Sequence, residues 1–474
     1  MFWLFRNQFN FMKDYRFSPQ IISRAIHHIP KILPSIHNLS RSQSMYLETL
    51  GLVGLCLYAF AFPFSKDICY IGEWMMVGAF ILSLPHLWPV MKSDPLWKAF
   101  LLLSAYLIFK GILTFFVYHE PVLDILDAIR FRLRFLWIFM IAWWLGGSTS
   151  SVLRIFFLSM IGVIVLIATG YETLSLEAFE RGRRLGFGIN RINPQHFSLY
   201  VASCLCGCLF LAKAFWGNRY KYLRVLLWTG LVLLFLEMTI LSQTRTVWIS
   251  LLAILIFWTI SAAIFVVKEK SLRDKKGKKI LLFAILLLFL IVPTISFNTH
   301  VIQKRTSSDF DTLKELLFQD ENNVEFSESV ALRFALWKWA TDQIKNKPLF
   351  GWKIDNTSRE FIGKSETIDK NASHFHHSHN TYLEIMLNQG LTGFFIFLFF
   401  PVYVGWSIWR LFRKGMLSYG FFMTFCSVAI LFAFANTCEA YITSWLFWPY
   451  FTIFFGGFYS LSLWNRLSAE GSVT

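Results

Sequence analysis

The chain has 474 residues, of which 55% are hydrophobic, 18% aromatic and 16% charged, and its mean hydropathy is positive. A soluble domain is about 45–50% apolar and about 25% charged, so this chain cannot shield its apolar surface from water by folding on itself. The composition predicts a polytopic membrane protein and excludes a soluble enzyme, a disordered scaffold and a secreted disulfide module. The apolar runs are helix-length and do not alternate, which also excludes an outer-membrane barrel.

Residues 1–45 form a basic leader of mixed polarity. The leader lacks a signal-peptide core and a cleavage site, so we expect it to stay in the cytoplasm, where it can lie on the membrane surface. About twelve apolar runs that are long enough, or nearly long enough, to span a membrane follow it. These runs lie near residues 46–64, 70–91, 98–117, 133–147, 154–170, 195–214, 224–241, 246–267, 280–297, 386–409, 417–437 and 443–464. The fold class predicted by this pattern is an all-α membrane protein.

The basic residues predict the orientation of the chain. The leader, the tract 268–279 and the segment 410–414 are rich in Lys and Arg, and such segments remain on the cytoplasmic side. Both termini are therefore expected in the cytoplasm. Much of the net charge of +16 is a topology signal, so no nucleic-acid partner is expected. The predicted organisation is a leader 1–45, spans in 46–297, an outside loop 298–385, spans in 386–464 and a cytoplasmic tail 465–474.

The outside loop 298–385 is nearly a small domain in size, and loops of this length are usually functional or disordered. Residues 329–345 predict an amphipathic helix, because Leu332, Leu336, Trp339 and Ala340 fall on one stripe. Pro348 and Gly351 mark the break after this helix, and a second helix is expected to begin near Asn380 and to continue into the next span.

Arginines gather on the outside face, where the positive-inside rule disfavours them. Four of them lie in the Gly- and Asn-rich segment 181–197, namely Arg181, Arg183, Arg184 and Arg191. A guanidinium binds phosphate through two parallel hydrogen bonds, so this group predicts an anionic ligand, with lipid headgroups as the alternative partner. Arg245 is expected at the outer end of a span, either as a second ligand for that anion or as the ion-pair partner of Glu237, and both roles are compatible.

Four histidines lie within six residues just before an apolar helix, namely His374, His376, His377 and His379. Imidazole accepts a proton near neutral pH, so the cluster predicts a general base. A zinc site and a solvated His-rich turn are the alternatives; against zinc, the cluster holds no Cys and lacks the spacing of a helical zinc motif. Gly390 and Gly393, further along the predicted helix, allow another helix to approach closely.

Three segments together resemble the O-antigen ligase and O-antigen polymerase family of bacterial inner-membrane glycosyltransferases. The first is His379-Asn380 followed, after nine residues, by Gly390-x-x-Gly393, with His377 completing a His-x-His-Asn form. The second is Arg333-x-x-x-Trp337-x-x-Ala340 followed by Pro348-Leu349-Phe350-Gly351, and the third is Ser242-x-x-Arg245. The predicted topology also matches the family. The resemblance covers roughly residues 46–464 and implies a lipid-carrier-dependent glycosyltransferase of the C-type fold.

The resemblance implies an O-antigen ligase that moves a glycan from undecaprenyl pyrophosphate to a lipid A–core sugar at the periplasmic face of the inner membrane. It selects His379 as the general base, with His377 and Asn380 at the acceptor. Arg245 and Arg333 then stabilise the leaving pyrophosphate, helped by the arginines of 181–191. The expected reaction inverts the anomeric centre and uses neither a metal nor another cofactor. A repeat-unit polymerase is the alternative within the family; a transporter or lipid flippase and a structural membrane scaffold are the alternatives outside it.

Overall fold

The computed structural model describes residues 41–170, 192–212, 220–269, 329–355, 357–362 and 377–470, and these residues contain helices and no β-strand. The helices of the first half are α3 (Arg41–Ala61), α4 (Lys66–Met91), α5 (Pro95–Tyr118), α6 (Val122–Arg132), the 3-10 turn η3 (Leu133–Phe135), α7 (Leu136–Trp144), α8 (Thr149–Thr169) and α10 (Pro194–Phe210). Those of the second half are α11 (Lys221–Leu241), α12 (Arg245–Glu269), α15 (Ser329–Asn346), α16 (Thr357–Ile362), α17 (Thr381–Arg413), α18 (Tyr419–Ala435), the 3-10 turn η8 (Tyr441–Thr443) and α19 (Phe447–Glu470).

Five of the described helices are long and apolar enough to cross a membrane, namely α4, α5, α8, α17 and the Tyr222–Leu241 part of α11. Three shorter apolar helices lie at Tyr46–Ala61, Arg245–Ser261 and Tyr419–Ala435. These helices confirm the predicted all-α polytopic membrane protein, whereas the number of about twelve spans stays a prediction.

The fourth predicted run, 133–147, is part of a longer and interrupted element. The helix begins earlier, at Val122, and the 3-10 turn Leu133–Phe135 divides it into α6 and α7. Two arginines at this turn have different partners: Arg132 bonds Asp355 at 2.8 Å, and Arg134 bonds Glu73 at 3.0 Å. The two cations at the start of this apolar run are therefore paired with acids from distant segments, as buried charges require.

Aromatic rings fill the space between α7, α17 and α19. Phe135 lies 4.5 Å from Phe400 and 5.1 Å from Trp448, measured between ring centroids. Small residues let other helices approach closely: a Cβ on Gly54 would lie 2.8 Å from the carbonyl oxygen of Gly72. Close backbone packing of this kind is how helices associate where lipid removes the hydrophobic driving force.

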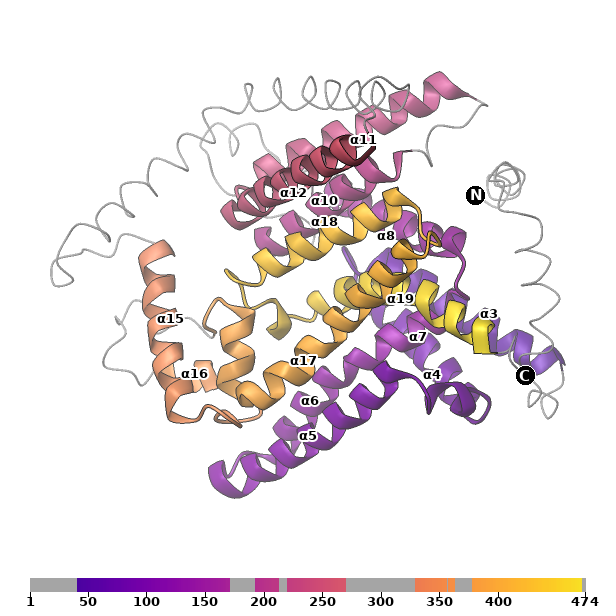
Figure 1. The fold of residues 1–474 in the computed structure, drawn as a ribbon. Helices are drawn as coiled ribbons and strands as arrows, with labels where there is room; N and C mark the ends of the chain where they lie inside the picture. Colours follow the sequence, from indigo (N-terminus) through magenta and orange to yellow (C-terminus); the bar gives the residue numbers. More distant parts are fainter. Residues whose placement is uncertain are drawn as a thin grey trace.

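Several helix ends meet at one end of the bundle, where α15 and α16 stand beyond the first turns of α17 (Figure 1). Thr244, just before α12, bonds the carbonyl oxygen of Pro194 at the start of α10. Thr381, at the start of α17, donates its backbone N–H to the carbonyl oxygen of Asn436 at the end of α18. Segments far apart in the sequence are thus brought together around the start of α17.

The predicted loop helix is confirmed as α15, and so is its apolar stripe. Leu336, Trp339 and Ala340 are buried and form a small separate core with Ile362 and Leu387. The side chain of Leu332 lies outside the described part. This core fixes α15 against α16 and the first half of α17.

Candidate active site

Two glycines join the turn after α15 to the middle of α17. Gly351 and Gly390 both have positive φ, +65° and +64°, and α17 is kinked at Gly390. A Cβ on Gly390 would lie 2.3 Å from the carbonyl oxygen of Leu349, so the two backbones are in direct contact. The residues after the kink use this contact, since Leu391 N–H donates to Pro348 O at 2.8 Å.

The partner of Gly390 is therefore a turn and not the helix that the sequence predicted. Gly393 does meet a helix, because a Cβ there would lie 3.0 Å from the ring of Tyr106 on α5. The buried Lys110, also on α5, donates to the carbonyl oxygens of Phe350 at 2.6 Å and Trp352 at 3.1 Å. The turn after α15 is thus held by contacts with both α17 and α5.

The first turn of α17 is built by Asn380. Its side-chain oxygen accepts from the backbone N–H groups of Tyr382 and Leu383, at 2.9 and 3.1 Å, which is an N-cap. Cap geometry leaves the preceding residue outside the helix, and His379 adopts φ +51° there. The predicted helix start is confirmed, and the N-cap at Asn380 leaves Ser378 and His379 outside the helix, where they border the site.

A buried carboxylate ties this turn to its neighbours. Glu384, one turn into α17, is 3% exposed. Its Oε2 accepts from the backbone N–H and the hydroxyl of Ser378, at 3.0 and 2.9 Å, and from the hydroxyl of Ser358 on α16 at 2.8 Å. Its other oxygen accepts from Asn388 at 3.1 Å. A carboxylate with this many donors is fully satisfied, so its role is to fix the turn that carries the histidines.

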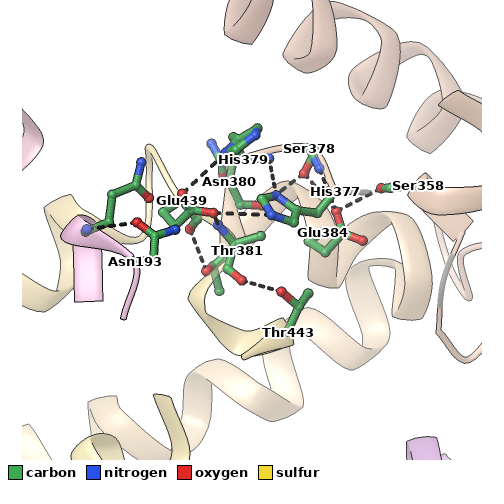
Figure 2. Close-up of polar contacts among 12 residues, drawn as sticks. Asn193, Ser358, His377, Ser378, His379, Asn380, Thr381, Glu384, Glu439 and Thr443 are labelled. Carbon is green, nitrogen blue, oxygen red and sulfur yellow. Dashed lines mark hydrogen bonds and ion pairs between the residues drawn. The ribbon is translucent and has the colours of Figure 1, made fainter. Parts of the chain in front are cut away.

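His377 and His379 both face Glu439, in the short segment between α18 and η8, as Figure 2 shows. Nδ1 of His379 lies 3.3 Å from Oε2 of Glu439, and Nε2 of His377 lies 3.5 Å from Oε1. The backbone N–H of His379 also donates to Nδ1 of His377 at 3.3 Å. The two imidazoles therefore share one carboxylate. Because Nδ1 of His379 contacts Glu439, its Nε2 lies on the side of the ring away from this carboxylate.

Glu439 is ionised in this setting. Burial of its carboxyl group raises the pKa, but the hydrogen bond to His379 and the positive charges that His379, His377 and His196 can carry lower it, and the resulting pKa lies below the ordinary value. Glu439 is 5% exposed, and the backbone N–H of Ala440 donates to its Oε1 at 3.1 Å. A buried, charged acceptor next to an imidazole is the arrangement that orients a histidine and fixes its tautomer.

The same three side chains are where a divalent metal would bind. Their ligand atoms all lie within 4.8 Å of one another. Two imidazoles and one carboxylate are suitable zinc ligands. The same contacts also have an explanation with no ion, as a hydrogen bond between His379 and Glu439 and an ion pair between His377 and Glu439. The geometry leaves both the general base and the metal alternative chemically possible.

Arg245 and Arg333 come from different helices, α12 and α15. Arg245 begins α12 after a turn in which Gln243 has φ +49°. Arg333, half-buried on α15, acts electrostatically on the phenol of Tyr441, whose ring packs edge-on against His196 at 4.8 Å. His377, His379 and Asn380 are thus placed together, whereas the two arginines lie on neighbouring packing pairs: α15 packs against α17, and α12 packs against α18. Arg181, Arg183, Arg184, Arg191, His374 and His376 lie outside the described residues.

Glu439 was not among the candidates from the sequence. One signal could have found it: it is the sole acid between the predicted spans 417–437 and 443–464, in a loop expected on the outside face. Its pairing with His379 joins residues 60 positions apart, a separation that no local pattern reveals.

A cavity of about 220 Å³ lies beside His377. It is bounded by α6, Asp355, α16, α17 and η8. Its lining residues are Phe131, Arg132, Asp355, Arg359, His377, Glu384, Ile385, Asn388, Gln389, Phe397, Ile442 and Thr443. The lining is partly apolar and partly polar, and His377 connects the cavity to the imidazole pair.

Comparison with known proteins gives one family and several relatives. The sequence profile of the family described as O-antigen ligase matches residues 229–398, which include Arg245, Arg333 and His379. A general O-oligosaccharyltransferase of Acinetobacter baylyi is 27% identical over 225 residues, which are 46% of this chain and 35% of that protein. A ComP-specific O-oligosaccharyltransferase of the same organism is 25% identical over 195 residues, 40% of this chain and 30% of that protein.

The matched stretches thus span about a third of the length of these curated relatives. The family profile covers all three motif segments, which lie at the start of α12, along α15 with the turn after it, and at the histidine turn with the first half of α17. The profile match confirms the resemblance drawn from the motifs: residues 229–398 of this chain match the profile of the O-antigen ligase family.

Proposed function

We propose that this protein is a glycosyltransferase that transfers a lipid-linked glycan to an acceptor hydroxyl at the outer face of the bacterial inner membrane. The observation that carries the proposal is the contact of 3.3 Å between Nδ1 of His379 and the buried carboxylate of Glu439. It lies at the histidine turn of a segment that matches the profile of the O-antigen ligase family. A permease or flippase has no need of an oriented imidazole at a helix start.

His379 acts as the general base. Glu439 accepts the Nδ1–H, which leaves Nε2 to take the proton of the attacking hydroxyl. The acceptor oxygen attacks the anomeric carbon, its proton goes to Nε2, and the bond between that carbon and the pyrophosphate breaks. A single displacement of this kind inverts the anomeric centre. His377, which shares Glu439, orients the acceptor beside the base.

The leaving pyrophosphate needs positive charge that is fixed before the reaction begins. Arg245 and Arg333 supply it from α12 and α15, and the arginines of 181–191 add to it. Planar guanidinium groups pair with phosphate oxygens through two bonds, so they can replace a metal ion on the pyrophosphate. The reaction is therefore proposed to be metal-independent.

The proposed donor is a glycan on undecaprenyl pyrophosphate and the proposed acceptor is a sugar of the lipid A–core, which makes the protein an O-antigen ligase. The predicted loop 298–385 would then face the periplasm, with both termini in the cytoplasm. A repeat-unit polymerase uses the same base and the same leaving group. The names of the two Acinetobacter relatives favour a further candidate, the transfer of an oligosaccharide to a hydroxyl of another macromolecule.

The profile of lipopolysaccharide in a deletion strain tests the proposal. A ligase deletion is expected to lose all long chains from lipid A–core, and a wild-type copy restores them while the His379→Ala copy does not. The purified His379→Ala protein should lose about 10²–10⁴ of its transfer rate, because that is the contribution of a general base. A core that carries a single repeat unit identifies a polymerase instead, and unchanged long chains contradict both activities.

A further inference from the structure

The cavity beside His377 has a mixed lining. Its apolar residues include Phe131, Phe397 and Ile442, which come from three elements. Its polar residues include Asp355, Gln389 and Thr443. A sugar ring has a similar combination, since its C–H faces are apolar and its edge carries hydroxyl groups. Apolar surface beside placed polar groups is what such a ligand requires.

Gln389 supplies the observation that points to a ligand. It is completely buried, and its side-chain NH2 donates to the carbonyl oxygen of Ile354 at 2.5 Å. Within the described chain, no group donates to its Oε1. A buried acceptor left without a donor is unfavourable, and such groups are rare in folded proteins. A hydroxyl of a molecule in the cavity would satisfy it.

The charges that line the cavity favour a neutral polyol, because the two guanidinium groups of Arg132 and Arg359 are balanced by the two carboxylates of Asp355 and Glu384. Arg132 is held by Asp355 at 2.8 Å and by the carbonyl oxygen of Ala128 at 3.0 Å, so its charge is already compensated. The Asp355 side chain is 30% exposed and offers its second oxygen to a donor. Carboxylate and amide oxygens that face a cavity accept hydrogen bonds from hydroxyl groups.

The position of the cavity favours the acceptor over the donor. His377, which lines it, lies 4.2 Å from His379 between ring centroids. The described residues that line the cavity include neither Arg245 nor Arg333, the residues proposed for the pyrophosphate. An inverting displacement needs the attacking hydroxyl on the side of the anomeric carbon opposite the leaving group. A ring seated beside His377, in a cavity that neither Arg245 nor Arg333 lines, meets that need.

We infer that this cavity is the subsite for the acceptor sugar, a neutral hydroxyl-bearing ring bound by Gln389, Asp355 and Thr443. The inference rests on the proposed function and extends it, because it makes a sugar the acceptor. It predicts that the cavity residues affect the affinity for the acceptor and leave the affinity for the lipid-linked donor unchanged.

The test compares two cavity variants with two matched controls. Gln389→Met and Asp355→Asn remove acceptor atoms in the cavity. Gln343→Met on α15 and Asp127→Asn on α6 make the same changes outside it, and Asp127 is largely exposed. The cavity variants should raise the acceptor KM in purified protein by about threefold to tenfold, the value of a hydrogen bond or two. Their donor KM should stay within about twofold of the wild-type value, and both controls should leave both KM values unchanged.

Binding without turnover gives an independent readout. The His379→Ala protein is titrated calorimetrically with the core oligosaccharide released from lipid A–core, and the cavity changes are added to that background. They should weaken binding by the same factor. If Gln389→Met melts at a lower temperature than the wild type, its weaker binding could come from unfolding. Thr443→Val then replaces it in the titration, because this variant leaves the bond between Gln389 and Ile354 in place.

The outcomes separate the subsite from the proposed function. Transfer by the wild type with equal acceptor KM in all variants overturns the subsite and leaves the function standing. A raised donor KM with an unchanged acceptor KM overturns the acceptor assignment and places a donor sugar in the cavity. Oligosaccharide binding that the cavity variants weaken, together with a wild-type protein that transfers nothing, supports the subsite and contradicts the function. No binding of the oligosaccharide to the His379→Ala protein also overturns the subsite.

Discussion

Replacing Gly390 with Ala should destabilise the protein and lower its transfer activity. Gly390 has φ +64° and ψ −175°, a backbone region that is essentially restricted to glycine. A Cβ there would lie 2.3 Å from the carbonyl oxygen and 2.4 Å from the carbonyl carbon of Leu349. Both atoms are backbone, so no side-chain rotation relieves the overlap. The turn after α15 must move away from α17.

The expected loss of stability follows from these contacts. A strained backbone conformation costs about 1–3 kcal/mol. Moving the turn also breaks two backbone hydrogen bonds, from Leu391 to Pro348 at 2.8 Å and from Thr392 to Leu349 at 3.1 Å. Each contributes about 0.5–1.5 kcal/mol, so the variant should lose about 2–6 kcal/mol. Because a misplacement of about 1 Å can lower a rate about 10²-fold, transfer should fall further than the amount of folded protein.

Gly230→Ala on α11 is the matched control, because a Cβ there meets nothing within 4 Å. In a helix interior Ala is favoured over Gly by about 1 kcal/mol, so this variant should be as stable as the wild type or more stable. The assay is thermal unfolding of both purified proteins in detergent, with transfer activity measured per folded molecule. Equal melting temperatures for the two variants would refute the reasoning, because the contact between the turn and the kink could then not be tight.

Three further predictions concern the site. Arg245→Ala and Arg333→Ala should abolish transfer at normal protein level, and the Lys variants should recover only part of it because a point charge lacks the planar pair of donors; full activity of the Ala variants in the purified assay would remove the pyrophosphate role. Glu439→Gln should lower kcat/KM about 10- to 150-fold, since a hydrogen bond to a charged group contributes about 1.5–3 kcal/mol. The depressed pKa of Glu439 means that its carboxylate stabilises the fold above the unfolded pKa of about 4.3, and this contribution disappears as pH falls through the folded pKa. The difference in melting temperature between wild type and Glu439→Gln should therefore be largest at neutral pH and shrink in acid. A difference that does not depend on pH would contradict the assignment of a depressed pKa to Glu439. Transfer by the purified protein should continue in excess chelator, whereas loss that Zn²⁺ restores would make the imidazole–carboxylate group a metal site.

The local sequence was sufficient for the elements and for several residues of the site. Helix-length apolar runs predicted the all-α membrane fold, and the stripe on residues 329–345 predicted α15 with its buried face. The sequence also predicted a helix that begins near Asn380, and in the structure Asn380 is its N-cap, because a side-chain oxygen next to unpaired N–H groups has the same effect in any helix. The choice of His379 among four histidines came from the family motif, and its contact with Glu439 supports that choice.

Only the tertiary structure decided which distant segments meet. The pairing of Glu439 with two histidines, the contact between Gly351 and Gly390, and the cavity between α6, α17 and η8 each join residues from separate helices. The 3-10 turn between α6 and α7 also depends on packing, because the partners of Arg132 and Arg134 on either side of it lie in other segments. Periodicity and capping act within a few turns of one helix, whereas these contacts depend on how the helices pack. Composition and local pattern therefore determined the helices and several residues of the site, and packing determined which polar groups face one another.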